Sequence, residues 1–251
     1  MDKYTFVMQY GIHYELHYEL GSFEVMDGHV VDIGFDQIGD AVASIAAGEM
    51  VVVLDDKDRE NEGDLVMAAQ FVTAQAMAFF VRHGTGIVCV GMTGERIDAL
   101  DLPPMVASGN DRHQTAFTIS VDSRHGTQTG VSAADRARTV PALIDPATRP
   151  EDLMRPGHMF PLRAREGGVL ERRGHTEAAV DLARLAGCAP AGVICEIVAE
   201  DGSMARTPDL LRFARQHALK IITIADLAFY LQQGHDRRPA HAPFHENAKL
   251  A

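Results

Sequence analysis

A short apolar run that ends in a dense cluster of acids constrains this chain more than any other segment. Residues 50–54 are all apolar, which is typical of a strand buried on both faces of a sheet. The next ten residues, 55–64, carry six carboxylates together with Lys57 and Arg59. Such close carboxylates repel one another unless cations offset their charge. Bound Mg²⁺ or the two embedded basic side chains could do so, and a solvated acidic turn is the simpler alternative.

A calcium-binding EF-hand is a rival interpretation of this loop, and residue spacing tests it. Counting from Asp58, acids fall at positions 1, 3 and 5 and Gly63 falls at position 6. Position 12 is Ala69, however, where an EF-hand requires a bidentate Glu. The flanking helices are missing as well, so we reject the EF-hand.

Strand-like and helix-like segments alternate along the rest of the chain. Strands are predicted at 50–54, 64–69, 86–90, 116–121, 191–199 and 220–224. Helices are predicted to follow N-caps at Thr73, Ser132 and Thr207, and to cover 176–186, before a stop at Gly187, and 225–233. This order predicts one mixed α+β domain over residues 31–233. Residues 1–30 are expected to form an N-terminal extension and 234–251 a flexible tail.

The composition excludes several classes of protein. The formal net charge of −12 makes a nucleic-acid partner improbable, because such a surface repels phosphates. Three cysteines without CxxC spacing indicate neither a disulfide framework nor a structural zinc site. No apolar run reaches the roughly 18 residues that a membrane helix needs. We therefore expect a soluble cytoplasmic protein without a membrane or nucleic-acid partner.

A second candidate site lies where the predicted helix at 176 begins. Gly174, His175 and Thr176 would place free N–H groups and positive potential at a helix N-terminus, which favours an anion such as phosphate. Arg172 and Arg173 precede them, and an Arg can add a charge-assisted fork. Each residue also has an ordinary explanation: a surface basic pair, a helix cap, or a histidine that is only hydrogen-bonded.

Glu196 is harder to explain as an ordinary residue. It follows the apolar residues 193–195 in a predicted strand. A carboxylate there must be paired, be protonated or face a cavity. It is therefore either half of a buried salt bridge or a general acid or base with a shifted pKa.

Taken together, these motifs resemble the 3,4-dihydroxy-2-butanone-4-phosphate synthase family of riboflavin biosynthesis. The acidic loop matches the signature loop of that family. The resemblance spans roughly residues 35 to 232 in sequence order, and its further matching segments are 82–89, 129–136, 155–158, 174–177 and 204–208.

The resemblance implies an enzyme with a mixed-sheet α/β sandwich fold. Its members are lyases that convert ribulose 5-phosphate to 3,4-dihydroxy-2-butanone 4-phosphate and formate with Mg²⁺ or Mn²⁺. They act as homodimers with sites at the subunit interface. The metal ligands of the family fall on Glu60 and His175, and its catalytic positions on His158, Glu196 and Asp64. Its substrate-binding positions fall on Arg59, Glu60, Asp64, Arg172, Arg173, Gly174, His175, Thr176 and Glu196.

Three points stay open at the level of sequence. Many members carry a fused GTP cyclohydrolase II domain that is rich in cysteines. This chain has only three cysteines and no CxxC spacing, so it is expected to be monofunctional. Another Mg²⁺-dependent sugar-phosphate enzyme, such as an aldolase or isomerase, would use similar groups, and a catalytically dead binding protein is a third alternative. The sequence decides neither the number of ions nor which carboxylate acts first as the base.

Overall fold

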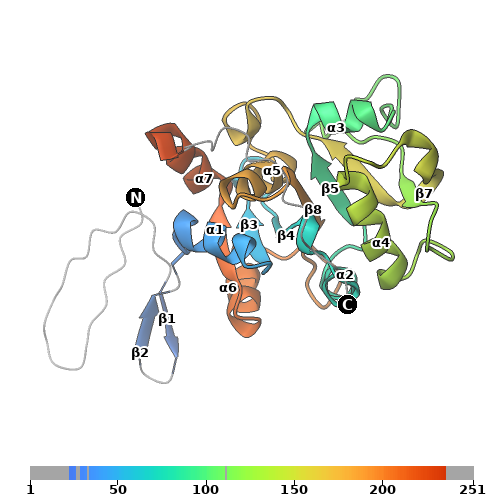
Figure 1. Ribbon diagram of the computed structural model, residues 1–251. Coiled ribbons are helices and arrows are strands. Elements are labelled where there is room, and N and C mark those ends of the chain that lie inside the picture. The colour runs from blue at the N-terminus through green and yellow to red at the C-terminus, as the bar shows by residue number, and fades with distance from the viewer. Residues whose placement is uncertain (1–22, 27–28, 33, 111, 236–251) are drawn as a thin grey trace, which may run out of the picture. The chain divides into compact units, whose positions relative to one another are not determined.

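The computed structural model describes residues 23–26, 29–32, 34–110 and 112–235 (Figure 1). Residue contacts divide the chain into two units, with the boundary between Phe35 and Asp36. In the first unit, β1 (Phe23–Met26) pairs with β2 (His29–Asp32) as a short antiparallel hairpin. The extension predicted over residues 1–30 and the tail predicted over 234–251 fall mostly outside the described residues.

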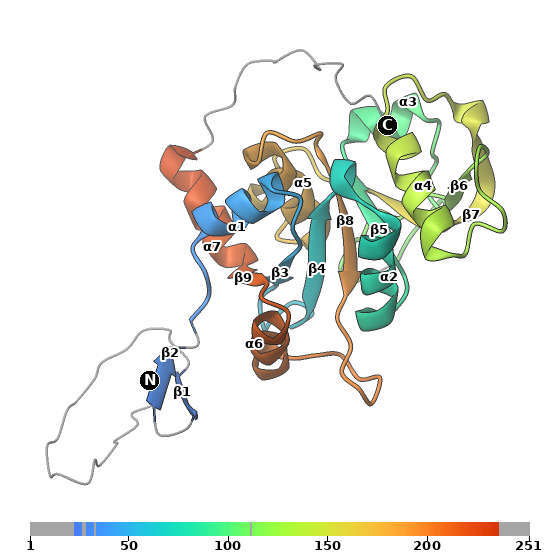
Figure 2. The same cartoon turned by 60° about the horizontal axis from the view of Figure 1, so that its bottom comes forward.

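The second unit is built on a mixed sheet with the strand order β6-β7-β5-β8-β4-β3-β9 (Figure 2). The β3–β9 and β5–β7 pairs are parallel, and the other neighbouring pairs are antiparallel. Its strands are β3 (Val51–Leu54), β4 (Gly63–Ala68), β5 (Cys89–Met92), β6 (Val121–Ser123), β7 (Leu153–Arg163), β8 (Ala191–Glu196) and β9 (Lys220–Thr223). This confirms the predicted α+β class.

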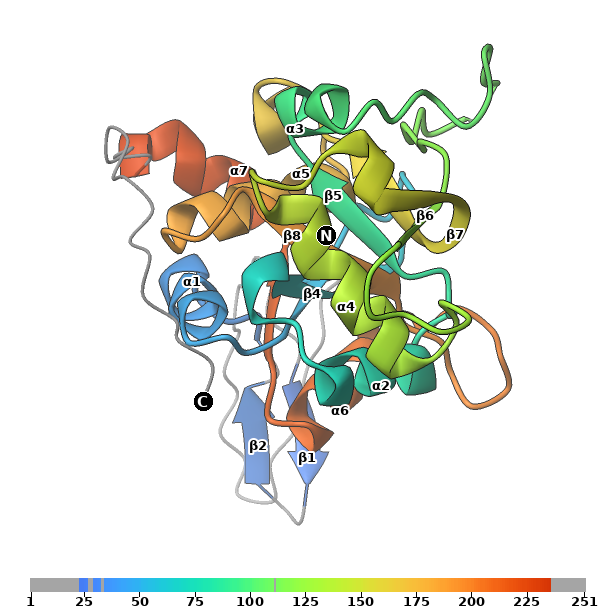
Figure 3. The same ribbon diagram turned by 45° about the vertical axis from the view of Figure 1, so that its right-hand side comes forward.

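Helices cover the two faces of this sheet (Figure 3). The helices α1 (Ile38–Ala46), α5 (His175–Leu185) and α7 (Ile224–Tyr230) share one core with side chains such as Val53, Val66 and Ile194. Gly91 and Gly192 let α5 lie close to the sheet, because an added Cβ would stand 2.8 Å from atoms of α5. The remaining helices are α2 (Ala74–His83), α3 (Gly94–Ala99), α4 (Ala133–Ile144) and α6 (Thr207–Gln216).

Local sequence signals located most helix ends correctly. The side chains of Thr73 and Ser132 accept hydrogen bonds from backbone N–H groups and cap α2 and α4, as predicted. Gly187 adopts the left-handed conformation just after α5. The predicted cap at Thr207 is wrong, since Arg206 is the N-cap residue of α6. There Asp209 accepts a hydrogen bond from the backbone N–H of Arg206.

Four other elements differ from the sequence expectation. The predicted strand at 116–121 is regular only from Val121 on, because it pairs with β7 near Pro161, which has no N–H to donate. Strand β7 was not predicted, since Pro, Gly and charged residues interrupt its apolar pattern. Helices α1 and α3 were not predicted either. Among the described residues, no helix is long and apolar enough to cross a membrane.

Candidate active site

The acidic loop is closed at its base by the sheet. Leu54 at the end of β3 pairs with Gly63 at the start of β4, so residues 55–62 form the connection of a hairpin. Asp55 is buried and organises this connection through both carboxylate oxygens. Oδ1 accepts from the backbone N–H of Glu62 at 2.8 Å, and Oδ2 accepts from the N–H of Glu60 at 3.0 Å and from Arg59 Nη1 at 2.9 Å. The loop is thus folded around one of its own acids.

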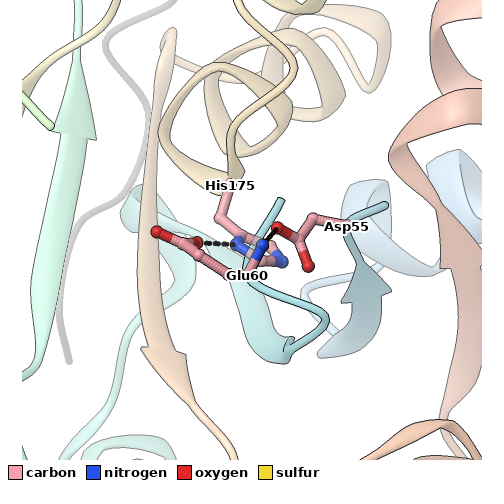
Figure 4. A group of neighbouring side chains, drawn as sticks. All are labelled: Asp55, Glu60 and His175. Atoms are coloured by element: carbon pink, nitrogen blue, oxygen red, sulfur yellow. Dashed lines mark hydrogen bonds and ion pairs between the residues drawn. The ribbon is translucent and has the colours of Figure 1, made fainter. Parts of the chain in front are cut away.

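His175, the first residue of α5, lies buried against the base of this loop (Figure 4). Its Nε2 is 3.1 Å from the carbonyl oxygen of Val53. A carbonyl only accepts, so Nε2 carries the proton and Nδ1 presents a lone pair. Nδ1 faces Glu60 Oε2 at 3.8 Å and Asp64 Oδ1 at 3.6 Å. Burial lowers the pKa of His175, which favours this neutral form.

Asp64 adds to this set a carboxylate oxygen that no donor in the described part of the chain reaches. Its Oδ1 is buried and has no hydrogen-bond partner among the described residues. Burial, and next the charge of Glu196, raises the pKa of Asp64 well above its usual value. An orphaned buried carboxylate oxygen is costly unless something positive faces it. A lone pair of His175 and a carboxylate of Glu60 beside it therefore fit a divalent cation.

Ligand chemistry narrows the ion and its ligands. Carboxylate oxygens suit Mg²⁺ and Mn²⁺, and a neutral imidazole held by a carbonyl is an oriented ligand. Ligand atoms of Asp55, Glu60 and His175 lie within 4.8 Å of one another. Both oxygens of Asp55 are already engaged by the loop, whereas Glu60 accepts only from Arg59 Nη1. Glu60 and His175 are therefore freer than Asp55 to serve as ligands.

Glu196 stands directly beside Asp64. The two residues are register partners on the antiparallel strands β8 and β4. The hydroxyl of Thr85 donates to Glu196 Oε2 at 2.7 Å, and the backbone N–H of Thr85 donates to the Glu196 carbonyl at 2.9 Å. The carboxylate is half-buried and its hydrogen bond comes from a hydroxyl, so it is not half of a buried salt bridge with an Arg.

His158 belongs to a different part of the sheet. Its Nδ1 is 2.7 Å from Asp122 Oδ2, and its backbone N–H donates to Asp122 Oδ1 at 2.9 Å. The register from Ile194 through Cys89 to Phe160 places β7 two strands away from β8. Two strand spacings are about 10 Å. In the described part of the chain, no hydrogen bond or ion pair links His158 to Glu60, Asp64 or His175.

Arg172 is engaged by its own chain rather than left free at the helix N-terminus. Its Nη1 donates to the buried Glu177 at 2.5 Å, its Nε and Nη2 donate to the His113 carbonyl, and Nη2 also donates to Thr115. Gly174 must be glycine, since a Cβ there would stand 2.1 Å from Arg172 Nη1.

The other residues of this predicted cradle, and Arg59, have distinct surroundings. Arg173 is half-exposed and lies 3.8 Å from Asp56. Thr176 is buried in the first turn of α5. The Nη1 of Arg59 is occupied by Asp55 and Glu60 within the acidic loop.

Sequence reasoning missed four residues that support these groups: Thr85, Asp122, Glu177 and Arg206. A buried acid flanked by apolar residues is a usable signal, and Asp122 follows Val121 in that way. Thr85 gave a weaker signal, as part of a motif whose glycines a helix end could explain. The contacts of Glu177 and Arg206 depend on the tertiary fold, and no local sequence pattern predicts these contacts.

The fold and the site together define a class: a mixed α+β protein with carboxylates and a histidine that could hold a divalent cation beside the β3–β4 connection. The sequence profile of 3,4-dihydroxy-2-butanone 4-phosphate synthase matches residues 39–230. The chain therefore belongs to this family.

Individual relatives agree with this assignment. The chain is 57% identical over 196 residues to a 3,4-dihydroxy-2-butanone 4-phosphate synthase from Agrobacterium fabrum, covering 78% of this chain and 92% of that protein. It is 60% identical over 205 residues to riboflavin biosynthesis protein RibBA from Synechocystis sp., covering 81% of this chain. The match covers only 37% of that RibBA protein. A separate match to a RibBA protein from Aquifex aeolicus covers 49% of that protein.

Solved structures show the same fold. The chain is similar, with a TM-score of 0.77 and 48% identity, to a crystal structure of 3,4-dihydroxy-2-butanone 4-phosphate synthase in complex with two magnesium ions. The match covers 79% of this chain and 98% of that one. A cation-free form of such a synthase matches with a TM-score of 0.75 and 47% identity, over 80% of this chain and 99% of that one.

Proposed function

We propose that this protein converts ribulose 5-phosphate to 3,4-dihydroxy-2-butanone 4-phosphate and formate in riboflavin biosynthesis, with Mg²⁺ or Mn²⁺ as cofactor. The observation that carries the proposal is the convergence of His175 Nδ1, Glu60 and the partnerless oxygen of Asp64. Membership of the synthase family gives this cation site its chemistry. The magnesium-bound relative with the same fold supports the choice of ion.

Glu60 and His175 would hold the cation. A bound divalent cation would supply Lewis-acid polarisation of substrate oxygens. The Val53 carbonyl keeps the lone pair of His175 pointing at Glu60, and the Asp55 carboxylate keeps the backbone of Glu60 in place. Preorganised ligands of this kind reduce the cost of ordering the site when the ion binds.

The paired carboxylates of Asp64 and Glu196 are candidates for the proton transfers. The reaction begins with removal of a proton from a carbon next to a ketone, which needs a base within hydrogen-bond reach. Burial and the adjacent Glu196 raise the pKa of Asp64, so this carboxyl holds a proton more readily than an ordinary Asp. The Thr85 hydroxyl orients Glu196. Two neighbouring acids in unlike surroundings suit alternate proton uptake and release.

The first turn of α5 is the proposed phosphate site. Its N-terminus carries unpaired N–H groups and positive potential. Gly174 lets the Arg172 guanidinium lie against the backbone at this point, and Arg173 is exposed enough to reach an anion. We assign substrate contacts to Arg59, Arg172 and Thr176 as well. In this proposal, Arg172 contacts the substrate while its guanidinium also donates to Glu177.

We further propose a homodimer whose active sites lie at the subunit interface. The support is that His158 stands about two strand spacings from Glu196 within one chain, so that a second copy is needed to bring a His158 to the cation site. Ile87 and Val131 are apolar side chains that are 49% and 50% exposed. Arg136 donates to the carbonyls of Val131 and Gly86, which holds these two apolar residues in one region. Such a patch suits burial between copies.

Mixing inactive variants tests the shared site. Glu60→Gln and His158→Ala chains are each expected to be inactive alone. After they are unfolded and refolded together, about a quarter of the wild-type activity should return, because half of the dimers then contain one intact site. No recovery, although mixed dimers form, would contradict a site shared between copies.

The activity itself is tested by formate release. The purified protein is incubated with ribulose 5-phosphate and Mg²⁺, with and without a chelator, and formate is measured. We expect formate and the four-carbon product only with the metal. No formate in either condition would contradict the proposed function.

Three narrower expectations remain predictions. Activity of the synthase alone is supported by the Agrobacterium relative, of which the chain covers 92%, and incubation with GTP tests for a second activity. A cytoplasmic location agrees with the free state of Cys89, Cys188 and Cys195, and cell fractionation tests it. The net charge of −12 argues against nucleic acid, which a binding assay at low salt tests.

A further inference from the structure

Arg206 holds the second half of the acidic loop. Its Nη1 donates to the carbonyl oxygen of Glu60 at 3.0 Å and to that of Asn61, and it lies 4.0 Å from the carboxylate of Glu62. One guanidinium nitrogen thus donates to two consecutive backbone carbonyls. Asn61 has φ +55°, a left-handed conformation that Asn tolerates better than most residues. The first half of the loop has a different anchor, the buried carboxylate of Asp55.

The backbone of Arg206 is itself fixed to the edge of the sheet. Its N–H donates to Asp209 Oδ2 at 3.1 Å in the capping box of α6. The preceding residue, Ala205, donates to the Ile197 carbonyl at 3.1 Å, and Ile197 in turn donates to the Gly63 carbonyl at 2.9 Å. The segment that carries Arg206 is therefore tied to the strand ends that carry Glu196 and Asp64.

Helix α6 also packs against the start of β4, where the acidic loop ends. A Cβ at Gly63 would meet the side chain of Leu210 at 2.5 Å, so α6 lies directly against the point where the loop re-enters β4. Two independent contacts, the Leu210 packing and the guanidinium, thus join α6 to residues 60–63. Hydrogen bonds from a charged guanidinium to carbonyls are stronger than neutral ones.

We propose that Arg206 is a positioning residue, which keeps the Glu60 backbone in place so that its carboxylate stays beside His175 Nδ1. The inference rests on the proposed function for its chemical meaning, because Glu60 matters there as a cation ligand. Arg206 contacts neither the cation site nor the substrate site directly, and it acts through the loop. Removing it leaves Asp55 to hold the loop from one side only.

Hydrogen–deuterium exchange of the metal-free protein tests the positioning. In Arg206→Ala, we expect amides of residues 56–62 to exchange at least about ten times faster than in the wild type, while those of β4 and β8 stay protected. Arg212→Ala is the matched control. Arg212 is also on α6 and pairs with Asp209, but it does not contact the loop in the structure. Equal exchange of the loop in both variants would overturn the proposal.

Binding of Mn²⁺ alone, followed by the electron paramagnetic resonance signal of the free ion, gives a second readout. Arg206→Ala is expected to raise the dissociation constant about tenfold, as other second-layer changes around metal ligands do. Arg206→Lys should recover part of it, and Arg212→Ala should match the wild type. An unchanged dissociation constant in Arg206→Ala contradicts the proposal, whereas a wild type that releases no formate contradicts the proposed function and leaves the exchange result valid.

Discussion

His175 and His158 each lie beside an aspartate, and the two places satisfy the histidine in opposite ways. At the acidic loop, Nε2 of His175 donates to the Val53 carbonyl, and its free lone pair faces Glu60 and the partnerless oxygen of Asp64. On β7, His158 and Asp122 share a hydrogen bond of 2.7 Å. The first arrangement offers acceptors to a cation, whereas the second pairs a donor with an acceptor.

The comparison teaches that residue types alone do not define a metal site. Both places hold an imidazole beside a carboxylate, and the difference lies in which nitrogen is already used. When a backbone carbonyl accepts a hydrogen bond from one imidazole nitrogen, the other nitrogen of the neutral ring is left as an acceptor. Asp122 instead orients an imidazole that remains 41% exposed.

Glu60→Gln is expected to have the largest effect. Loss of the negative ligand should lower kcat/KM about 1000-fold, since a bound metal contributes several kcal/mol of charge stabilisation. Mn²⁺ binding should be lost with it. Steady-state kinetics and titration with Mn²⁺ check both. Full metal-dependent activity in this variant would remove Glu60 from the cation site.

Asp122→Asn should separate the two places. We expect kcat to fall about 100-fold, because His158 loses the carboxylate that orients it. The affinity for Mn²⁺ should not change. His125→Gln is the matched control, since His125 faces Asp152 at 3.5 Å on the surface nearby and should tolerate the change. A parallel loss of Mn²⁺ affinity in Asp122→Asn would mean that the two places are coupled.

Asp64→Asn tests whether the first place truly lacks a positive partner. Without metal, the free energy of unfolding should rise by about 1–2 kcal/mol, because a buried carboxylate without a partner is removed. The stabilisation by Mg²⁺ should shrink at the same time. Urea unfolding with EDTA and with Mg²⁺ measures both effects.

Asp181→Asn is the control for this change. Asp181 is also buried, but it accepts from the Val169 N–H at 2.8 Å, so its substitution should destabilise the protein. If both variants shift the free energy of unfolding in the same direction, the contrast between a satisfied and an orphaned carboxylate is wrong.

Thr85→Val is expected to have the smallest effect. It removes the hydroxyl that donates to Glu196, and kcat should fall about five- to tenfold, because a typical net hydrogen bond contributes roughly 1 kcal/mol. Thr73→Ala at the other end of α2 loses a helix cap instead. That control should lower stability by about 1 kcal/mol and leave kcat unchanged.

The elements that were predictable are those whose signals are local. The apolar run before Asp55 predicted β3, and the hydroxyls of Thr73 and Ser132 predicted helix starts, because capping depends on neighbouring residues only. Strand β7 was missed, since its residues are stabilised by pairing with β5 and β6, which lie far away in the sequence. Propensity cannot anticipate such pairing.

The residues of the candidate site likewise divide into those that the sequence indicates and those that depend on long-range contacts. Glu60 and His175 were named from the family resemblance, and the structure brings them together at 3.8 Å. The partners that orient the site residues could not be predicted. The Val53 carbonyl contacts His175, Asp122 contacts His158 and Arg206 contacts the Glu60 backbone, each across a long stretch of sequence. The pairing of Asp64 with Glu196 likewise depends on a register that neither segment specifies alone.

The register match between Leu54 and Gly63 has a consequence for protein engineering. Since the sheet closes the hairpin below the acidic loop, residues 55–62 form an exchangeable cassette. Loops with other acid spacings can be grafted there while His175, Asp64 and Glu196 stay on the helix and strands that carry them. A library varied only in this cassette would alter metal preference without redesigning the scaffold.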